Sequence, residues 1–203
     1  HLWAEEVELP YNGPLDELSR KRVRNDYPLL AMWELGIQKL RVPISDLIDD
    51  RIRQRMIDLY RLKRRFTVFS FGEPSDSTIQ TMKDHRNIVE QWEIVLPPNR
   101  LKGVCARLLR EPAGSLPAVL YSKLRGHGAA ARSSSEPFDH SVAVGFDRAE
   151  PLETALRDLS QEERGVLSGV TFKIEIDQEL APAIDEIAER ARASQVKPVI
   201  FAK

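Results

Sequence analysis

The stretch FTVFSFGEPSDSTIQTMKDHRNIVEQWEIVL, Phe66 to Leu96, contains the repeating pattern that decides the fold. It begins with an apolar, β-rich run over Phe66–Gly72, continues with a helix-length segment over Ser75–Glu90 and ends with a second β-rich run over Trp92–Leu96. Strand, helix and strand in this order are typical of a parallel sheet whose strands are joined by crossover helices. The stretch therefore predicts one α/β unit.

The same alternation continues on both sides of this stretch. The predicted strands are Leu2–Leu9, Lys39–Pro43, Phe66–Gly72, Trp92–Leu96, Ala118–Leu124, Ser141–Asp147, Thr171–Asp177 and Pro198–Ala202. The predicted helices are Pro14–Leu35, Ile44–Lys63, Ser75–Glu90, Asn99–Arg110, Pro151–Val170 and Glu179–Ser194, of which several carry an apolar stripe at three- and four-residue spacing. Gly36 is predicted to stop the first of these helices.

This order of elements predicts an α/β fold with a mostly parallel sheet, closer to a (β/α) barrel than to an open sheet. A full eight-fold barrel usually takes about 250 residues, and this chain has 203. An incomplete barrel and an open doubly wound sheet therefore remain as alternatives. We expect a single α/β domain over residues 1–203, either alone or as part of a longer chain.

The charge balance argues against two classes of partner. The chain carries 30 Lys and Arg against 31 Asp and Glu, a formal net charge of -1. A dedicated nucleic-acid binder, or a protein held to anionic lipid by bulk charge, is expected to be basic. No apolar run approaches the roughly 20 residues of a membrane-spanning helix. We therefore expect neither nucleic acid nor membrane as a partner.

A single cysteine, Cys105, limits the chemistry further. One thiol can form neither an internal disulfide nor a multi-cysteine zinc site. Its neighbours in LKGVCARLL are mostly apolar, so we interpret Cys105 as a core thiol rather than a nucleophile. The lone cysteine and the acidic start of the chain, which lacks a signal-peptide pattern, predict a cytoplasmic location.

Charged side chains occupy one face of the predicted strand Thr171–Asp177. Successive side chains of a strand point to opposite faces, so this sequence separates into an apolar row and a row formed by Lys173, Glu175 and Asp177. In a barrel the apolar row meets the helices and the ionic row points inward, toward the carboxyl ends of the strands where sites lie. We therefore predict these three residues as catalytic; an edge strand with one solvated face is the alternative.

Polar residues near the ends of other strands complete this candidate site. Asp147, at the end of Ser141–Asp147, is a fourth catalytic candidate, although an Asp in this place also suits an N-cap or a turn. Lys123, near the end of Ala118–Leu124, and Arg41, within Lys39–Pro43, are predicted to bind the charge of an anionic substrate. The simpler interpretation of both is a solvated strand-end side chain.

The segment Arg125–His140 interrupts the alternation of strands and helices. It has no apolar periodicity and is rich in Gly, Ala and Ser, which predicts a long mobile loop. His127 and His140 lie near its two ends, and a closing loop would bring either imidazole over a substrate as an acid or base. Both are predicted as substrate-binding residues; two solvated loop histidines are the alternative.

Two chemistries fit these residues. The amine of Lys173 can form a Schiff base with a carbonyl group while Glu175 or Asp177 moves protons. A divalent metal held by Asp147, Glu175, Asp177 and His140 can instead stabilise an enolate. No ligand spacing is diagnostic, so the cofactor stays open, with a divalent metal as one option. The GxSxG, P-loop, HExxH, CxxC and GxGxxG motifs are absent.

The function predicted from these residues is an enzyme that acts on a small anionic carbonyl or carbohydrate compound by proton abstraction. An aldolase-like lyase and an isomerase both fit that description. The alternative is a non-catalytic accessory α/β domain of a larger protein that mediates interaction. In either case a second copy of the chain, or a further domain of the same chain, is an expected partner, because an open sheet edge invites pairing.

Overall fold

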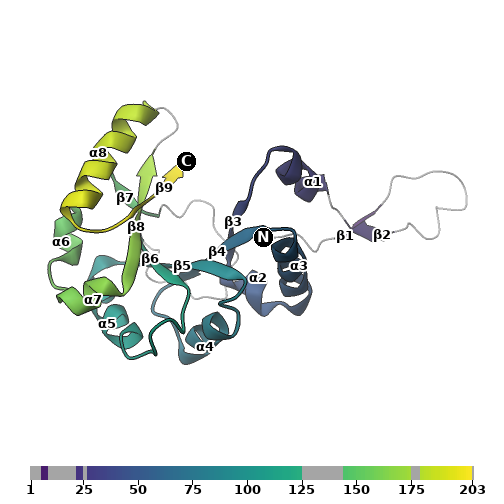
Figure 1. Cartoon of the computed structure of the whole chain (residues 1–203), viewed down its shortest axis with the longest axis horizontal. Coiled ribbons are helices and arrows are strands. Elements are labelled where there is room, and N and C mark those ends of the chain that lie inside the picture. The colour runs from purple at the N-terminus through teal and green to yellow at the C-terminus, as the bar shows by residue number, and fades with distance from the viewer. Residues whose placement is uncertain (1–5, 9–21, 25–26, 125–143, 175–178, 203) are drawn as a thin grey trace, which may run out of the picture. The chain divides into compact units, whose positions relative to one another are not determined.

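The computed structural model describes residues 6–8, 22–24, 27–124, 144–174 and 179–202 (Figure 1). The chain divides into two compact units, His1–Phe66 and Thr67–Lys203. The expectation of a single domain over residues 1–203 stays a prediction.

The first unit contains short strands and helices. β1 (Glu6–Glu8) and β2 (Arg22–Arg24) form an antiparallel two-stranded sheet. They are followed by α1 (Tyr27–Glu34), β3 (Lys39–Pro43), α2 (Ile44–Ile48) and α3 (Asp50–Arg61). The predicted strand Lys39–Pro43 is confirmed, whereas the predicted helix Pro14–Leu35 is wrong over β2. Gly36 follows α1 with a φ of 67°, the left-handed conformation expected of a helix-stop glycine.

The predicted helix Ile44–Lys63 is divided in two at Asp49. This residue has an extended backbone, and its side chain accepts hydrogen bonds from the backbone N–H groups of Arg51 and Ile52 at 2.9 and 3.0 Å. An Asp that caps the next helix in this way satisfies N–H groups that would otherwise lack partners. The apolar spacing continues across Asp49, so it does not indicate that a second helix starts there.

The second unit is built on a curled, mostly parallel sheet, a half-barrel with interleaved helices (Figure 1). The order of its strands is β4-β5-β6-β8, and both β7 and β9 pair with β8. The strands are β4 (Arg65–Phe71), which begins at the end of the first unit, β5 (Val89–Leu96), β6 (Ala118–Lys123), β7 (Phe146–Asp147), β8 (Leu167–Ile174) and β9 (Pro198–Ala202). The predicted α/β fold with a mostly parallel sheet is confirmed, in its incomplete form.

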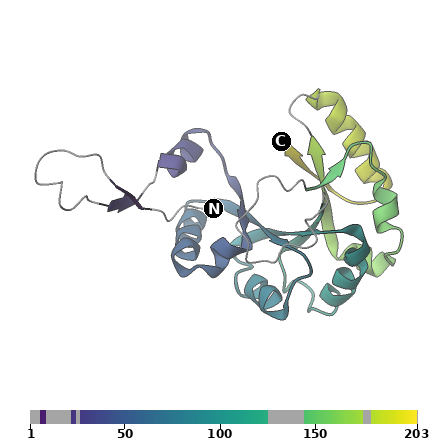
Figure 2. The same ribbon diagram turned by 180° about the vertical axis from the view of Figure 1, so that it is seen from behind.

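Among the described residues of this unit, five helices cover the outer side of the curled sheet (Figures 1 and 2). They are α4 (Asp76–Asp84), α5 (Pro98–Leu108), α6 (Leu152–Leu156), α7 (Gln161–Gly165) and α8 (Leu180–Ala193). Crossover helices on one side of a sheet are the arrangement that a barrel requires. Within the described ranges, no helix has the length and apolar character needed to cross a bilayer.

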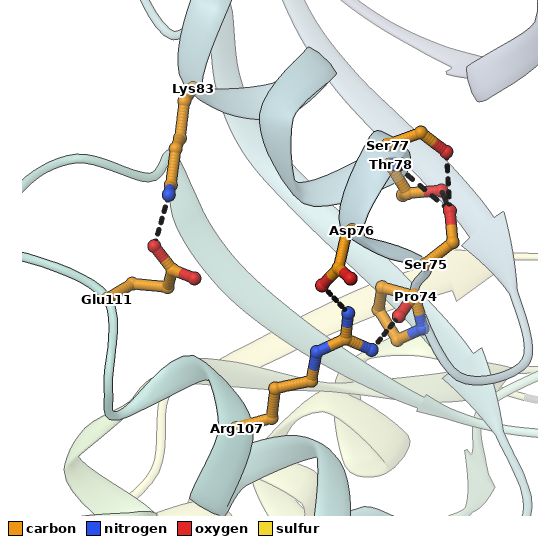
Figure 3. Close-up of polar contacts among 8 residues, drawn as sticks. All are labelled: Pro74, Ser75, Asp76, Ser77, Thr78, Lys83, Arg107 and Glu111. Atoms are coloured by element: carbon orange, nitrogen blue, oxygen red, sulfur yellow. Dashed lines mark hydrogen bonds and ion pairs between the residues drawn. The ribbon is translucent and has the colours of Figure 1, made fainter.

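Polar contacts join the neighbouring helices α4 and α5 (Figure 3). Arg107 of α5 donates to the carbonyl oxygen of Pro74 and forms an ion pair with Asp76 in the first turn of α4. At the other end of α4, Lys83 forms an ion pair with Glu111, just after α5. The two helices are thus fastened to one another at both ends of α4.

The predicted helix Pro151–Val170 is confirmed only in part and is wrong over Leu167–Val170. It consists of α6 and α7, and from Leu167 onward the chain is already strand β8. Ser160 starts α7 with a capping box, in which its hydroxyl accepts from the N–H of Glu163 and the Glu163 carboxyl accepts from the N–H of Ser160. Such a box begins a new helix and therefore interrupts the one before it.

Side chains on the helix-facing side of the sheet form the aromatic part of the core. The ring of Phe146 lies 5.7 Å from that of Tyr121 and 6.2 Å from that of Phe172, and all three side chains are buried. Burial raises the pKa of the Tyr121 phenol, and the thiol of Cys105 in α5 adds a smaller effect of the same sign. Because α5 covers the outer side, this row faces the helices, and the alternate residues of the same strands face inward.

Candidate functional site

The site is built where β7 meets the second half of β8. β9 pairs with Val170–Ile174 of β8, while β6 pairs with Leu167–Val170 and β7 with Phe172–Lys173. The part of β8 that pairs with β9 includes residues that pair with β6 and residues that pair with β7. β9 therefore lies on one side of β8, and β6 and β7 lie one after the other on its opposite side. β7 therefore continues the sheet where β6 ends, and it brings the residue after Phe146 beside the carboxyl end of β8.

Asp147 and Lys173 lie directly opposite each other in this parallel register. Both are half-buried. Phe146 and Phe172, the preceding register pair, belong to the helix-facing row, so Asp147 and Lys173 share the inward face. Neighbouring strands are about 4.8 Å apart, which puts a carboxylate and an amine within reach of the same small molecule. Of the predicted site residues that the structure describes, these two are the ones that it brings together.

Gly145 allows this close approach of β7 to β8. Its φ is 91°, and a Cβ atom at this position would lie 3.1 Å from the carbonyl oxygen of Thr171 and 3.3 Å from the backbone nitrogen of Lys173. Its N–H donates to the carbonyl oxygen of Lys123 at 2.9 Å. Only glycine combines this backbone conformation with this separation at no steric cost. Gly145 therefore helps to set the position of Asp147.

Lys123 lies at the same end of the sheet but on the other row. Its Nζ atom is 5.7 Å from the ring centroid of Phe146, which places it with the helix-facing side chains. It forms an ion pair with Glu150, whose carbonyl oxygen accepts from Nη1 of Arg190 in α8 at 2.9 Å. These contacts favour a structural role for Lys123 over the predicted contact with substrate.

The other predicted residues either belong to the first unit or lie outside the described residues. Arg41 lies in β3 of the first unit and is half-buried. Glu175 and Asp177, predicted from the sequence to share a row with Lys173, lie outside the described residues. The same holds for His127 and His140 and for the rest of the predicted mobile loop Arg125–His140. Their roles stay predictions.

A buried polar row on the inner face was missed by the sequence analysis. It consists of Glu93 of β5, Ser122 of β6 and Thr171 of β8, which are 2%, 0% and 3% exposed. The Ser122 hydroxyl donates a hydrogen bond to Oε1 of Glu93. One signal could have revealed the row: Glu93 interrupts the apolar run WEIVL, and a charged residue is rarely buried without a partner.

Cys105 is the core thiol that its apolar neighbours predict. It is fully buried in α5, and this burial, with a smaller effect of Glu163, raises the pKa of the thiol to about 12. A thiol with so high a pKa carries almost no nucleophilic thiolate at neutral pH. Across the described segments, no three His, Cys, Asp or Glu side chains are arranged to hold a metal ion.

No protein-family model matches the chain, and no curated protein sequence matches it.

Proposed function

We propose that the protein is an enzyme that removes a proton next to the carbonyl group of a small anionic compound, as an isomerase or an aldolase-like lyase. The observation that carries the proposal is the register of Asp147 and Lys173 on the inner face, at the carboxyl ends of two parallel strands. Sites of barrel-like α/β folds lie at this end of the strands. Because one fold hosts many chemistries, the reaction is inferred from the side chains of the site and not from the fold.

The two side chains have different roles in the enolisation of the substrate. The Asp147 carboxylate takes the proton from the carbon next to the carbonyl. The electron pair of that C–H bond forms a carbon–carbon double bond, and the π pair of the C=O bond moves onto the carbonyl oxygen. The Lys173 ammonium, one strand away, stabilises the negative charge that develops on this oxygen. We favour this electrostatic role over a Schiff base, because a lysine amine attacks a carbonyl only when it is neutral, whereas charge stabilisation uses the ammonium form that lysine ordinarily has at neutral pH.

The nature of the substrate follows from the same pair. A compound bound between a carboxylate and an ammonium group needs a carbonyl group with an acidic C–H bond on the neighbouring carbon. It also needs an anionic group that binds further cationic side chains of the protein. A divalent metal held partly by Asp147 would serve the same enolisation by polarising the carbonyl oxygen. The cytoplasm, which supplies such metabolites and keeps a lone thiol reduced, is the location that we propose.

The proposal is tested by hydrogen exchange in D2O. The full chain is incubated with 2-oxo acids, hydroxylated 2-oxo acids and ketose phosphates, and loss of the α-proton signal is followed by NMR. We expect exchange above the buffer rate for at least one compound, and a loss of about 100-fold or more in Asp147→Asn and Lys173→Met. The exposed residues Asp158 and Lys102 provide the matched controls Asp158→Asn and Lys102→Met, which should keep the rate.

Two outcomes would overturn the proposal. One is exchange that Asp147→Asn leaves unchanged, which would place the base elsewhere. The other is a rate at the buffer level for every compound, with and without added Mg²⁺ or Mn²⁺. That result would favour the accessory, non-catalytic α/β domain.

A further inference from the structure

The inner face of the sheet contains the buried hydroxyl group of Thr171. Thr171 is 3% exposed, and within the described part of the chain its Oγ1 atom has no hydrogen-bond partner. A buried hydroxyl normally finds a partner, because leaving it without one forfeits the hydrogen bonds it makes with water. An unsatisfied donor beside a candidate site points to a group that arrives with the ligand.

The position of Thr171 connects it to the proposed site. It precedes Lys173 by two residues on β8, so both side chains lie on the inner face, about 6.6 Å apart along the strand. On β9 its register partner is Val199, which offers no polar group. On the β6 side, the register pair Tyr121 and Val170 is followed by Ser122 and Thr171, and the Ser122 hydroxyl is already donated to Glu93.

We propose that Thr171 binds substrate through its hydroxyl, so that the site takes a hydroxylated anionic carbonyl compound, such as a sugar acid or sugar phosphate. The inference rests on the proposed function, which puts the carbonyl oxygen at Lys173. A hydroxyl group one or two carbons from that carbonyl then reaches Oγ1 of Thr171 and either donates to it or accepts from it. A compound without this hydroxyl leaves Thr171 unsatisfied and binds less tightly.

The test measures binding rather than turnover. Dissociation constants are determined by calorimetry for two pairs of probes, hydroxypyruvate against pyruvate and dihydroxyacetone phosphate against hydroxyacetone phosphate. The members of each pair differ by one hydroxyl group, and the two pairs distinguish a carboxylate from a phosphate as the anionic group. We expect the wild-type chain to prefer the hydroxylated member of at least one pair by about 5- to 10-fold.

Two substitutions locate this preference at Thr171. Thr171→Val keeps the shape but removes the hydroxyl, and should abolish the preference while leaving the affinity for the other member of the pair unchanged. Thr171→Ser keeps the hydroxyl and should keep the preference. A preference that survives in Thr171→Val, or wild-type binding of neither member of either pair, would overturn the inference.

A stability measurement shows independently whether the hydroxyl is free within the fold. Thr67 of β4 donates from Oγ1 to Oε1 of Gln91 at 3.0 Å, which makes Thr67→Val the matched control. Thr67→Val should lower the melting temperature, whereas Thr171→Val should leave it unchanged or raise it; an equal loss in both would show that Thr171 is satisfied by the protein itself. Binding preference without hydrogen exchange would overturn the proposed enolisation and leave this inference standing.

Discussion

Lys123 and Glu150 form an ion pair that joins the end of β6 to the turn after β7, and their side chains are only 23% and 21% exposed. An ion pair removed from much of the solvent is screened less than one at the surface. The pair also lies beside the ring of Phe146, where β7 follows β6 as the strand that pairs with β8. We therefore expect it to hold this corner of the sheet.

A double-mutant cycle measures the strength of this pair. Lys123→Met, Glu150→Gln and the double variant should give a coupling of about 1 kcal/mol in the free energy of unfolding, near the upper end for partly exposed pairs. The matched control is the pair Arg100 and Glu73, 3.3 Å apart with side chains 64% and 53% exposed, where the coupling should fall below about 0.5 kcal/mol. Equal couplings for the two pairs would contradict the structural role of Lys123.

Gly145→Ala should destabilise the protein by more than about 1 kcal/mol. The added Cβ meets the backbone of Thr171 and Lys173 at 3.1 and 3.3 Å, and the φ of 91° is strained for alanine. Gly103→Ala is the control, because a Cβ there has no heavy atom within 4 Å and the residue lies inside α5. That substitution should stabilise the chain by about 0.5–1 kcal/mol. Urea unfolding measures whether the free energy of unfolding falls in Gly145→Ala and rises in Gly103→Ala.

Ser122→Ala removes a donor from the buried carboxyl group of Glu93. Leaving a buried polar group short of a partner costs about 1–3 kcal/mol, so unfolding in urea should show a loss in this range. Ser70→Ala is the comparison: it removes the acceptor of the Trp92 indole N–H, a neutral bond of 2.9 Å, and should cost about 1 kcal/mol. A Ser122→Ala protein as stable as the wild type would show that Glu93 does not need this hydrogen bond.

The alternation of β-rich runs with helix-length segments sufficed to predict the mostly parallel sheet. Pro198–Ala202 and Lys39–Pro43 are strands with the predicted bounds. Errors arose where a local hydrogen bond outweighs periodicity. The caps at Asp49 and Ser160 start new helices inside segments that the sequence analysis predicts as single helices. Helix caps are short-range signals that a count of apolar spacing does not include.

The candidate site was predictable only in part, for a reason of geometry. Alternation along β8 places Lys173 on the inner face, and the position of Asp147 at the end of β7 follows from the sequence. The partner of each strand depends on register, which sequence periodicity does not determine. The sequence analysis therefore could not tell that Asp147 faces Lys173, that Lys123 belongs with Glu150, or that Glu93, Ser122 and Thr171 share a buried row.

Cys105 should be protected from labelling in the native protein and should make the fold sensitive to alkali. It is the single thiol of the chain, so dithiobis(nitrobenzoate) at pH 8 reports on it alone. Because it is fully buried and its pKa is about 12, we expect slow labelling without denaturant and rapid labelling in urea. Rapid labelling of the native chain would contradict its place in the core.

The pH dependence follows from the direction of the same shift. The pKa of the thiol rises from 9.0 to about 12 in the folded chain, so below pH 9 the thiol is neutral in both states and its contribution to stability is complete. Between pH 9 and 12 the unfolded chain loses the proton and the folded chain keeps it, so the free energy of unfolding falls by up to about 1.4 kcal/mol per pH unit. Burial also raises the pKa of Tyr121, which adds a loss of the same sign.

Two variants separate these contributions in urea unfolding between pH 8 and 11. Cys105→Ala lowers stability at every pH because it removes buried volume, but its free energy of unfolding should decline less steeply above pH 9 than that of the wild type. Tyr121→Phe should flatten the decline at the upper end of this range, and it should cost little stability at pH 8 because the phenol oxygen has no hydrogen-bond partner among the described residues. Parallel pH profiles for the wild type and Cys105→Ala would show that the thiol ionises equally well in the folded and unfolded chain.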